Sequence, residues 1–154
     1  MPIIGLISDT HGLLRPEALD ALKGSDFILH AGDIGKPEIL TELNGLAPVT
    51  VVRGNIDKGA WAEAIPATDV LEVRGSVLLY MLHNLEELDL DPVAAGFHAV
   101  IYGHSHKPGY RWKDGVLYVN PGSAGPRRFS LPVSVGRLIV DRDGLSVEIL
   151  DLGT

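Results

Sequence analysis

Seven side chains that can bind metal ions occur in five short motifs of this 154-residue chain. The motifs are Asp-x-His, Gly-Asp, Gly-Asn, a single His and Gly-His-x-His. The candidate ligands that they supply are Asp9, His11, Asp33, Asn55, His83, His104 and His106. Because the chain has no Cys, the side chains that bind a metal would use nitrogen or oxygen. Imidazole and carboxylate together suit divalent transition metals better than Mg²⁺, so the motifs indicate metal-dependent chemistry.

Each motif also has a structural interpretation that involves no metal. An Asp-x-His sequence such as residues 9–11 often forms a turn or a cap. Gly-Asp and Gly-Asn pairs are typical of loops, and Asp57 could cap the segment that follows the second pair. His83 alone could be a hydrogen-bonded structural residue. The segment Gly103-His104-Ser105-His106 is more informative, although a surface pair of histidines is the alternative.

The first half of the chain alternates apolar runs with helical patterns. Continuous apolar runs predict strands, the first of them buried on both faces, at residues 3–7, 27–29 and 49–52. Between them, Pro16 begins a helix that Gly24 ends, and a second helix is predicted at about residues 37–43. Three such cycles indicate βαβ units and a parallel sheet.

The second half has turn sequences between short apolar runs, which predicts a mainly antiparallel arrangement. The expected hairpins join residues 70–73 to 77–82, 110–112 to 116–119, and 135–140 to 145–150. A strand is expected at residues 99–102, and a helix at 86–95 that Asp91-Pro92 breaks or restarts. We therefore expect an α/β sandwich with a parallel half, an antiparallel half and helices outside.

All seven candidate ligands follow the ends of predicted strands. Ligands of open α/β sheets bind beyond the carboxyl ends of strands, so we expect these side chains to converge on one rim. His30, at the end of the second predicted strand, either orients a ligand or is a hydrogen-bonded core histidine. His98 has no motif around it and receives no role.

The composition narrows the class of protein. The length suits one domain, residues 1–154, and 13 basic against 20 acidic residues give a formal charge of −7. Nucleic acid is not an expected partner, because there is no basic surplus to neutralise phosphates. The first residues lack a basic segment and a cleavage site, and no apolar run could span a bilayer, so we expect a cytoplasmic protein without a membrane partner. Exposed edge strands could pair two copies into a homo-oligomer.

The five motifs, in this order, resemble the signature of the calcineurin-like metallophosphoesterases, and they cover residues 9–106. The length and the segment Asn120-Pro121-Gly122-Ser123 are similar to the small bacterial and archaeal branch of YfcE-like phosphodiesterases. The resemblance implies a four-layer α/β/β/α sandwich of two mixed sheets flanked by helices.

The resemblance also implies a dinuclear metal centre. One metal would be bound by Asp9, His11, Asp33 and His106, and the other by Asp33, Asn55, His83 and His104, so that Asp33 bridges them. We expect two divalent transition-metal ions, manganese first, with nickel, iron, cobalt and zinc as alternatives. A hydroxide that bridges the metals would attack the phosphoester in line, and Asp33, Asn55 and His83 would be the catalytic residues.

Two positions depart from the family pattern. Ile56 stands where many larger members have a His that assists the leaving oxygen, which argues against monoesters with poor leaving groups. Asn84 stands where relatives usually have Gly, and it could narrow the space beside His83. The candidates to bind the phosphate, or else solvated surface arginines, are Arg53, Arg127 and Arg128.

The function expected from this resemblance is a phosphodiesterase that hydrolyses a small soluble phosphodiester or nucleotide. A non-catalytic metal-binding or scaffold protein is the alternative, because the eukaryotic retromer scaffold subunit shares this fold and is regarded as having lost the activity. The intact set of seven ligands favours the enzyme. A nuclease of the same superfamily is less attractive for a chain with a charge of −7 and no basic stripe.

Overall fold

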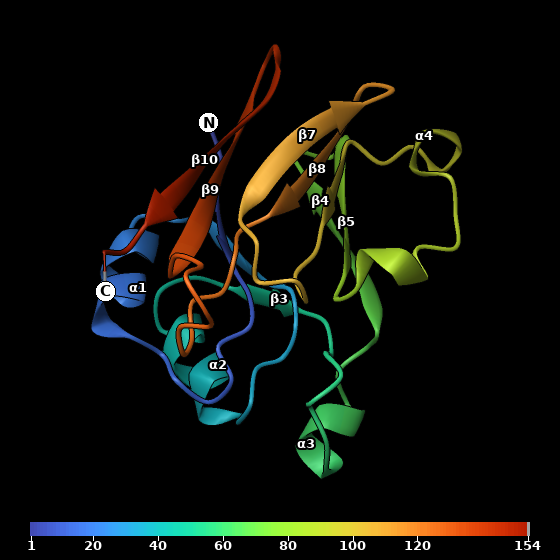
Figure 1. The fold of residues 1–154 in the computed structure, drawn as a ribbon. Helices are drawn as coiled ribbons and strands as arrows, with labels where there is room; N and C mark the ends of the chain where they lie inside the picture. The colour runs from blue at the N-terminus through green and yellow to red at the C-terminus, as the bar shows by residue number, and fades with distance from the viewer. Residues whose placement is uncertain (154) are drawn as a thin grey trace.

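Two five-stranded sheets lie face to face in the computed structural model, which describes residues 1–153 (Figure 1). The first sheet has the strand order β10-β9-β1-β2-β3. Its strands are β1 (Ile3–Ile7), β2 (Phe27–His30), β3 (Val49–Val51), β9 (Ser134–Asp141) and β10 (Gly144–Asp151). β1, β2 and β3 run parallel, whereas β9 runs antiparallel to β1 and pairs Leu138 with Ile4. This sheet therefore joins strands from both ends of the chain.

The second sheet has the strand order β4-β5-β6-β8-β7. Its strands are β4 (Thr68–Val73), β5 (Val77–Leu82), β6 (Ala99–Ile101), β7 (Gly109–Lys113) and β8 (Val116–Asn120). The inner strands β5, β6 and β8 run parallel, and the edge strands β4 and β7 are antiparallel to their neighbours. The expected split into a parallel and an antiparallel half is therefore wrong. Both sheets are mixed, as the family resemblance implied.

The strands bury their side chains in layers. Ile4 and Leu6 of β1 pack between the sheets against Leu79, Ile101 and Leu117 of the second sheet. Ile7 packs on the other face of the first sheet, in a separate cluster. The prediction that the 3–7 run is buried on both faces is confirmed, because helices cover the outer face of this sheet.

Those helices are α1 (Pro16–Leu22) and α2 (Glu38–Asn44), whose residues Leu22 and Leu43 pack on Ile28. The outer face of the second sheet has a thinner cover, made by the 3₁₀ helix η1 (Leu85–Glu87) and by α4 (Pro92–Ala95) (Figure 1). The predicted break at Asp91-Pro92 is confirmed, since the Asp91 side chain caps α4. A four-residue helix that was not predicted, α3 (Ala60–Glu63), lies below the sheets in this view. No helix within residues 1–153 is long and apolar enough to cross a membrane.

Candidate metal centre

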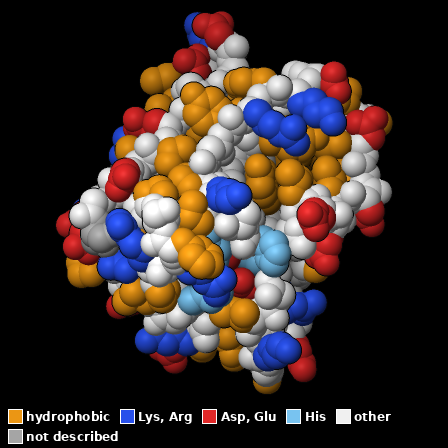
Figure 2. All heavy atoms as spheres, viewed as in Figure 1, with side chains coloured by type: hydrophobic (Ala, Val, Ile, Leu, Met, Phe, Trp, Pro, Cys, Tyr) orange, Lys and Arg blue, Asp and Glu red, His pale blue; other side chains and the backbone are white. Residues whose placement is uncertain are grey.

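The candidate ligands lie at one edge of the sandwich, where parallel strands of both sheets end. They are Asp9 and His11 after β1, Asp33 after β2, Asn55 after β3, His83 after β5, and His104 and His106 after β6. Figure 2 shows histidine side chains near the middle of one face of the molecule, with acidic and basic side chains close by. We call this the metal edge.

Two groups of potential ligand atoms form at the metal edge. Asp9, His11 and His106 offer atoms within 4.8 Å of one another, and so do Asp9, Asp33 and His83. His11 Nε2 lies 3.5 Å from Asp33 Oδ2, and His83 Nε2 lies 3.2 Å from the same oxygen. One carboxylate oxygen of Asp33 therefore faces histidines of both groups, as a shared ligand would require.

The polar atoms at this edge fit a metal site. Within residues 1–153, the buried side-chain polar atoms without a hydrogen-bond partner are Asp9 Oδ1, His11 Nε2 and His106 Nδ1. The amide oxygen of Asn55 lies 3.1 Å from His83 Nε2 and 3.3 Å from each carboxylate oxygen of Asp33. Either the amide turns over so that its nitrogen donates to these atoms, or a cation lies among them. Buried polar groups without partners are rare, and a cation would satisfy the buried atoms of Asp9 and His11 and bind the oxygen of the exposed Asn55 as well.

The backbone of the ligands is unusual. The backbone is left-handed at five of the seven candidates, with φ of +55° at Asp9, +47° at His11, +57° at Asp33, +73° at His104 and +63° at His106. For residues other than glycine this conformation costs roughly 1–2 kcal/mol each. Such strain persists only where the surrounding structure holds it, and it gathers at functional sites.

Two motif glycines let the ligand loops approach one another. A Cβ atom on Gly54 would lie 2.1 Å from Asp33 Oδ1 and 2.2 Å from Asp33 N. A Cβ atom on Gly103 would lie 2.1 Å from Ser8 Oγ and 2.6 Å from Asp9 Oδ2. The loop after β3 therefore packs on Asp33 and the loop after β6 packs on Asp9, and neither position has room for a side chain.

Asp9 is buried at the centre of these loops. Its Oδ2 accepts hydrogen bonds from Ser8 Oγ at 2.7 Å and from His104 N at 3.1 Å, and its Oδ1 lies 3.4 Å from His106 Nε2. Burial alone would raise the pKa of this carboxyl, but the interactions with His106, His11 and Ser8 hold the pKa well below its usual range. Asp9 is therefore an ionised carboxylate near neutral pH.

Asp33 and His83 are also coupled. Burial would raise the pKa of Asp33, but His83 and the Ile56 N–H keep it below its usual value. Burial would lower the pKa of His83, but Asp33 and the charge of Asp9 raise it above its usual value. His83 Nδ1 donates to Ala31 O at 2.8 Å, which leaves Nε2 to face Asp33.

His104 lies apart from the other candidates. His104 is exposed, and its ring lies nearly perpendicular to the His83 ring, with 5.3 Å between the ring centroids. Neither group of ligand atoms found within residues 1–153 includes His104. The structure thus brings six candidates together and leaves His104 on the rim beside His83.

Asp57, expected only as a possible cap, connects two ligand loops. Its Oδ1 accepts from Ile34 N at 2.9 Å and Gly35 N at 3.0 Å, and its Oδ2 accepts from Gly54 N at 2.9 Å. This buried carboxylate therefore ties the loop of Asp33 to the loop of Asn55. No local pattern distinguishes it from a capping Asp.

Asn120 supports the loop after β6. Its Nδ2 donates to Gly103 O and Ser105 Oγ, both at 3.1 Å, and its Oδ1 accepts from Gly122 N at 2.9 Å. The sequence of residues 120–123 carries a family resemblance but predicts no structural role for Asn120. Its structural role is to fix the Gly-His-x-His loop.

His30 is fully buried between the first two ligand loops. Its Nδ1 accepts from Gly32 N at 3.1 Å, and its Nε2 lies 3.0 Å from Thr10 Oγ1, which donates to Ile34 O at 2.8 Å. Burial lowers the pKa of His30 to about 4, although the charges of Asp9 and Asp57 oppose this. His30 is therefore neutral near pH 7, and its hydrogen bonds link the two loops through Thr10 and Gly32.

The three arginine candidates occupy different places. Arg53 Nη1 donates to Ala62 O at 3.5 Å and Ile65 O at 3.2 Å, so its guanidinium group is held beside α3. Arg127 and Arg128 are exposed in the segment after Gly125, which itself packs on the carbonyl of Thr10. Only Arg53 lines the cleft beside His83.

That cleft has a volume of about 240 Å³ and opens beside the second group of ligand atoms. Its walls include Asn55, His83 and His104 on the metal side, and Arg53, Asn84 and Glu87 around it. Asn84 lines the cleft while its Oδ1 accepts from Glu86 N at 3.1 Å and caps η1. A second hollow, of about 200 Å³, adjoins Asn84 and His104 and extends to Tyr102 and Ser105.

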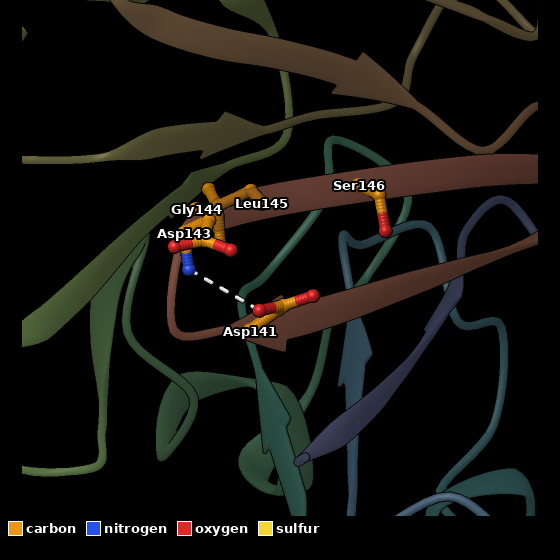
Figure 3. A pocket seen from close by; sticks show the side chains of 5 residues that line it. All are labelled: Asp141, Asp143, Gly144, Leu145 and Ser146. Atoms are coloured by element: carbon orange, nitrogen blue, oxygen red, sulfur yellow. Dashed lines mark hydrogen bonds between the residues drawn. The ribbon is translucent and has the colours of Figure 1, made fainter.

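A hollow at the other end of the sandwich has a different character. It has a volume of about 160 Å³ and lies at the β9–β10 turn, where Asp143 N donates to Asp141 Oδ1 at 3.2 Å (Figure 3). The remaining residues around it are Gly144, Leu145 and Ser146. It contains no imidazole, and its two carboxylates lie on an exposed turn.

Comparisons of sequence connect this geometry to known proteins. The family model of the calcineurin-like phosphoesterase superfamily domain matches residues 3–143 of this chain. A protein of Methanothermobacter thermautotrophicus named as a probable metallophosphoesterase is 37% identical over 163 residues, which cover 98% of this chain and 93% of the relative. A phosphodiesterase of Methanocaldococcus jannaschii is 27% identical over 137 residues, which cover 77% of this chain and 82% of the relative.

Solved structures show the same architecture. A structure from Streptococcus pneumoniae, described as a predicted phosphoesterase, has a TM-score of 0.76 at 26% identity and covers 98% of this chain and 90% of its own. Vps29 from Entamoeba histolytica, in complex with zinc, has a TM-score of 0.74 at 21% identity. The match covers 98% of this chain and 99% of the Vps29 chain. At 21% identity, the similarity to Vps29 concerns the fold alone.

Proposed function

This chain belongs to the calcineurin-like phosphoesterase superfamily, and on that premise we propose that it is a dinuclear metal-dependent phosphodiesterase. The observation that carries the proposal is Asp33 Oδ2, which faces His11 Nε2 at 3.5 Å and His83 Nε2 at 3.2 Å. A carboxylate oxygen placed between two histidines of different groups suits a shared ligand. The unpartnered atoms of Asp9 and His11 support the same interpretation.

The side chains have distinct parts in this proposal. Two divalent ions, manganese first among the candidates, would polarise the phosphoryl oxygens and lower the pKa of a bound water. Asp9 and Asp33 supply two negative charges, and Asn55 supplies an oxygen without adding a third. His83 is oriented by Ala31 O and His106 faces Asp9, so both imidazoles are positioned before substrate arrives. His104 and Asn55 are the proposed ligands that are exposed to solvent.

The proposed substrate is a small phosphodiester rather than a nucleic acid. The chain has a formal charge of −7, which disfavours a long polyanion. The two hollows of about 240 and 200 Å³ that share Asn84 and His104 could each take one substituent of a diester. The relative from Methanocaldococcus jannaschii is named as a phosphodiesterase, which favours the same class.

A non-catalytic scaffold is the competing function, because Vps29 proteins share the fold. Metal binding alone does not separate the two functions, since a Vps29 structure contains zinc. Turnover is therefore the decisive measurement.

The test is hydrolysis of bis(4-nitrophenyl) phosphate, 4-nitrophenyl phosphate and cyclic and linear nucleotides, with Mn, Ni, Co, Zn and Mg, alongside the metal content of each sample. We expect the diester to be hydrolysed fastest and up to two metal ions to be bound per chain. Asp33→Asn and His83→Ala should each lower kcat by at least about 1,000-fold.

The matched control is Asp143→Asn, the same chemical change in the exposed β9–β10 turn, which should leave kcat unchanged. Circular dichroism should show that all variants are folded. A protein that binds metal but turns over none of the substrates would contradict the enzyme and support the scaffold.

A further inference from the structure

We propose that Glu87 selects phosphodiesters in which the small alcohol group beside the metal edge has an amino or hydroxyl donor. The inference rests on the proposed function and adds a substrate class to it. It follows from the cleft of about 240 Å³ that Glu87 lines together with Arg53 and Asn84.

The cleft is continuous with the proposed metal ligands. Asn55, His83 and His104 form one part of its wall, so a phosphoryl group held at the metal edge would direct a substituent into it. Pockets that bury drug-sized ligands span roughly 300–1,000 Å³, which is larger than this cleft of about 240 Å³. An alcohol of two or three carbons fits within this space.

Glu87 has a carboxylate that is available to a ligand. In the part of the chain that the structure describes, no hydrogen bond or ion pair engages this carboxylate, and the residue is exposed. Its backbone is held, because Glu87 N donates to Asn84 O at 3.0 Å in the turn of η1. The Asn84 side chain caps the same turn through Glu86 N. A carboxylate accepts hydrogen bonds and attracts cations, so it favours donors on the substrate.

Arg53 places the opposite charge in the same cleft. Its guanidinium group is anchored by the carbonyls of Ala62 and Ile65, and it forms no ion pair with Glu87. A substrate with an anionic phosphoryl group and a donor on its alcohol would match both charges. An alcohol that carries a carboxylate would meet Glu87 with the same charge.

The experiment compares four 4-nitrophenyl phosphodiesters whose second alcohol is 2-aminoethyl, 2-hydroxyethyl, 2-methoxyethyl or carboxymethyl. For the metal-loaded protein we expect kcat/KM for the 2-aminoethyl diester to exceed that for 2-methoxyethyl by about tenfold, since a charge-assisted hydrogen bond has about that effect, and kcat/KM for the 2-hydroxyethyl diester to lie between these two. The carboxymethyl diester should be the poorest substrate.

Two variants and one control isolate Glu87. Glu87→Gln should reduce the aminoethyl diester to the level of the hydroxyethyl diester, and Glu87→Lys should make the carboxymethyl diester better than the aminoethyl diester. Glu72→Gln is the matched control, because Glu72 is likewise exposed on the second sheet but lines neither hollow. This control variant should keep the wild-type order of kcat/KM among the four diesters.

Calorimetry supplies a measurement that does not depend on turnover. The metal-loaded protein should bind 2-aminoethylphosphonate about tenfold more tightly than propylphosphonate, and Glu87→Gln, which removes the charge but keeps an acceptor oxygen, should lower this ratio. If wild type hydrolyses all four diesters and Glu87→Gln leaves their relative kcat/KM values unchanged, the proposed selection by Glu87 is overturned. The proposed phosphodiesterase activity then stands. If no diester is hydrolysed but the phosphonate preference depends on Glu87, the phosphodiesterase fails and the donor-selecting site stands.

Discussion

Residues with left-handed backbone gather at both ends of the sandwich, at the metal edge and at the hairpin turns opposite it. In the turns, Arg74 at φ +56° and Asp114 at φ +52° are each followed by a glycine with positive φ. This pair of conformations joins antiparallel strands that twist to the right. At the metal edge, buried residues such as Asp9 and Asp33 have similar angles but belong to no hairpin.

The two ends differ in what holds the conformation. Gly75 and Gly115 in the turns have no neighbouring atom within 4 Å of a Cβ position, whereas a Cβ on Gly54 or Gly103 would overlap a ligand loop. Conformation at the turns is thus determined locally by two or three residues. At the metal edge it is imposed by contacts between loops that are distant in the chain.

Replacement of one glycine at each end should give the largest contrast. Gly54→Ala places a methyl group against Asp33, so the loop must move, and we expect a loss of about 4 kcal/mol in the free energy of unfolding. Gly75→Ala, at φ +71° in open space, should cost only about 1 kcal/mol. Urea unfolding checks both values, and equal losses would contradict the contrast.

Acid should weaken the metal edge first, because the buried aspartates and histidines within residues 1–153 all lie at or next to it. His30 has a pKa of about 4 in the folded state against 6.5 as its ordinary value, so the unfolded chain binds the extra proton between these pH values. Stability should therefore fall as pH decreases from 6.5 to 4, by about 3 kcal/mol in total.

The other groups with shifted pKa values change the free energy of unfolding outside the range from pH 4 to 6.5. Because the pKa of His83 is raised on folding, its contribution to stability is complete below pH 6.5. Because the pKa values of Asp9 and Asp33 are lowered on folding, their contributions to stability are lost only below pH 3.8. Urea unfolding of the metal-free protein at several pH values measures the slope. His30→Asn, which does not titrate, should flatten it, and an unchanged slope in this variant would reject His30 as the cause.

The smallest effect concerns the carboxylate that ties two ligand loops. Asp57→Asn replaces one acceptor with an NH₂ group that faces backbone donors, and we expect a loss of about 2 kcal/mol and a metal affinity about tenfold lower. Asp141→Asn, whose acceptor lies in the exposed β9–β10 turn, should cost less than about 0.5 kcal/mol. Metal titration and urea unfolding would show whether Asp57 differs from this control.

The strands and hairpins could be predicted because their signals are local. The run at residues 3–7 and the turn Asp114-Gly115 carry their structure in adjacent residues. The membership of β9 and β10 in the first sheet could not be predicted, because the pairing of Ile4 with Leu138 has no local signal. The expectation of separate parallel and antiparallel halves failed for this reason.

In the candidate site, too, some features have a local sequence signal and others depend on tertiary packing. The motif order selected the seven candidates, and six of them lie together in the structure. The position of His104 on the rim and the carbonyl anchors of Arg53 depend on tertiary packing, which no motif encodes. The sequence around Asp57 predicts only a cap, because the three backbone donors that it binds belong to two loops that are distant in the chain.

The pairing of β1 with β9 also bears on the order of events during synthesis. Every proposed ligand has been translated once residue 106 emerges from the ribosome, but β1 lacks one neighbour until residues 134–141 follow. Pairing of such distant segments gives a high contact order, which slows folding. The second sheet, built from residues 68–120, is complete earlier and can form while the N-terminal strands still wait for their partner. Nascent chains arrested between residues 120 and 134 would therefore carry all the histidines while the first sheet still lacks β9 and β10.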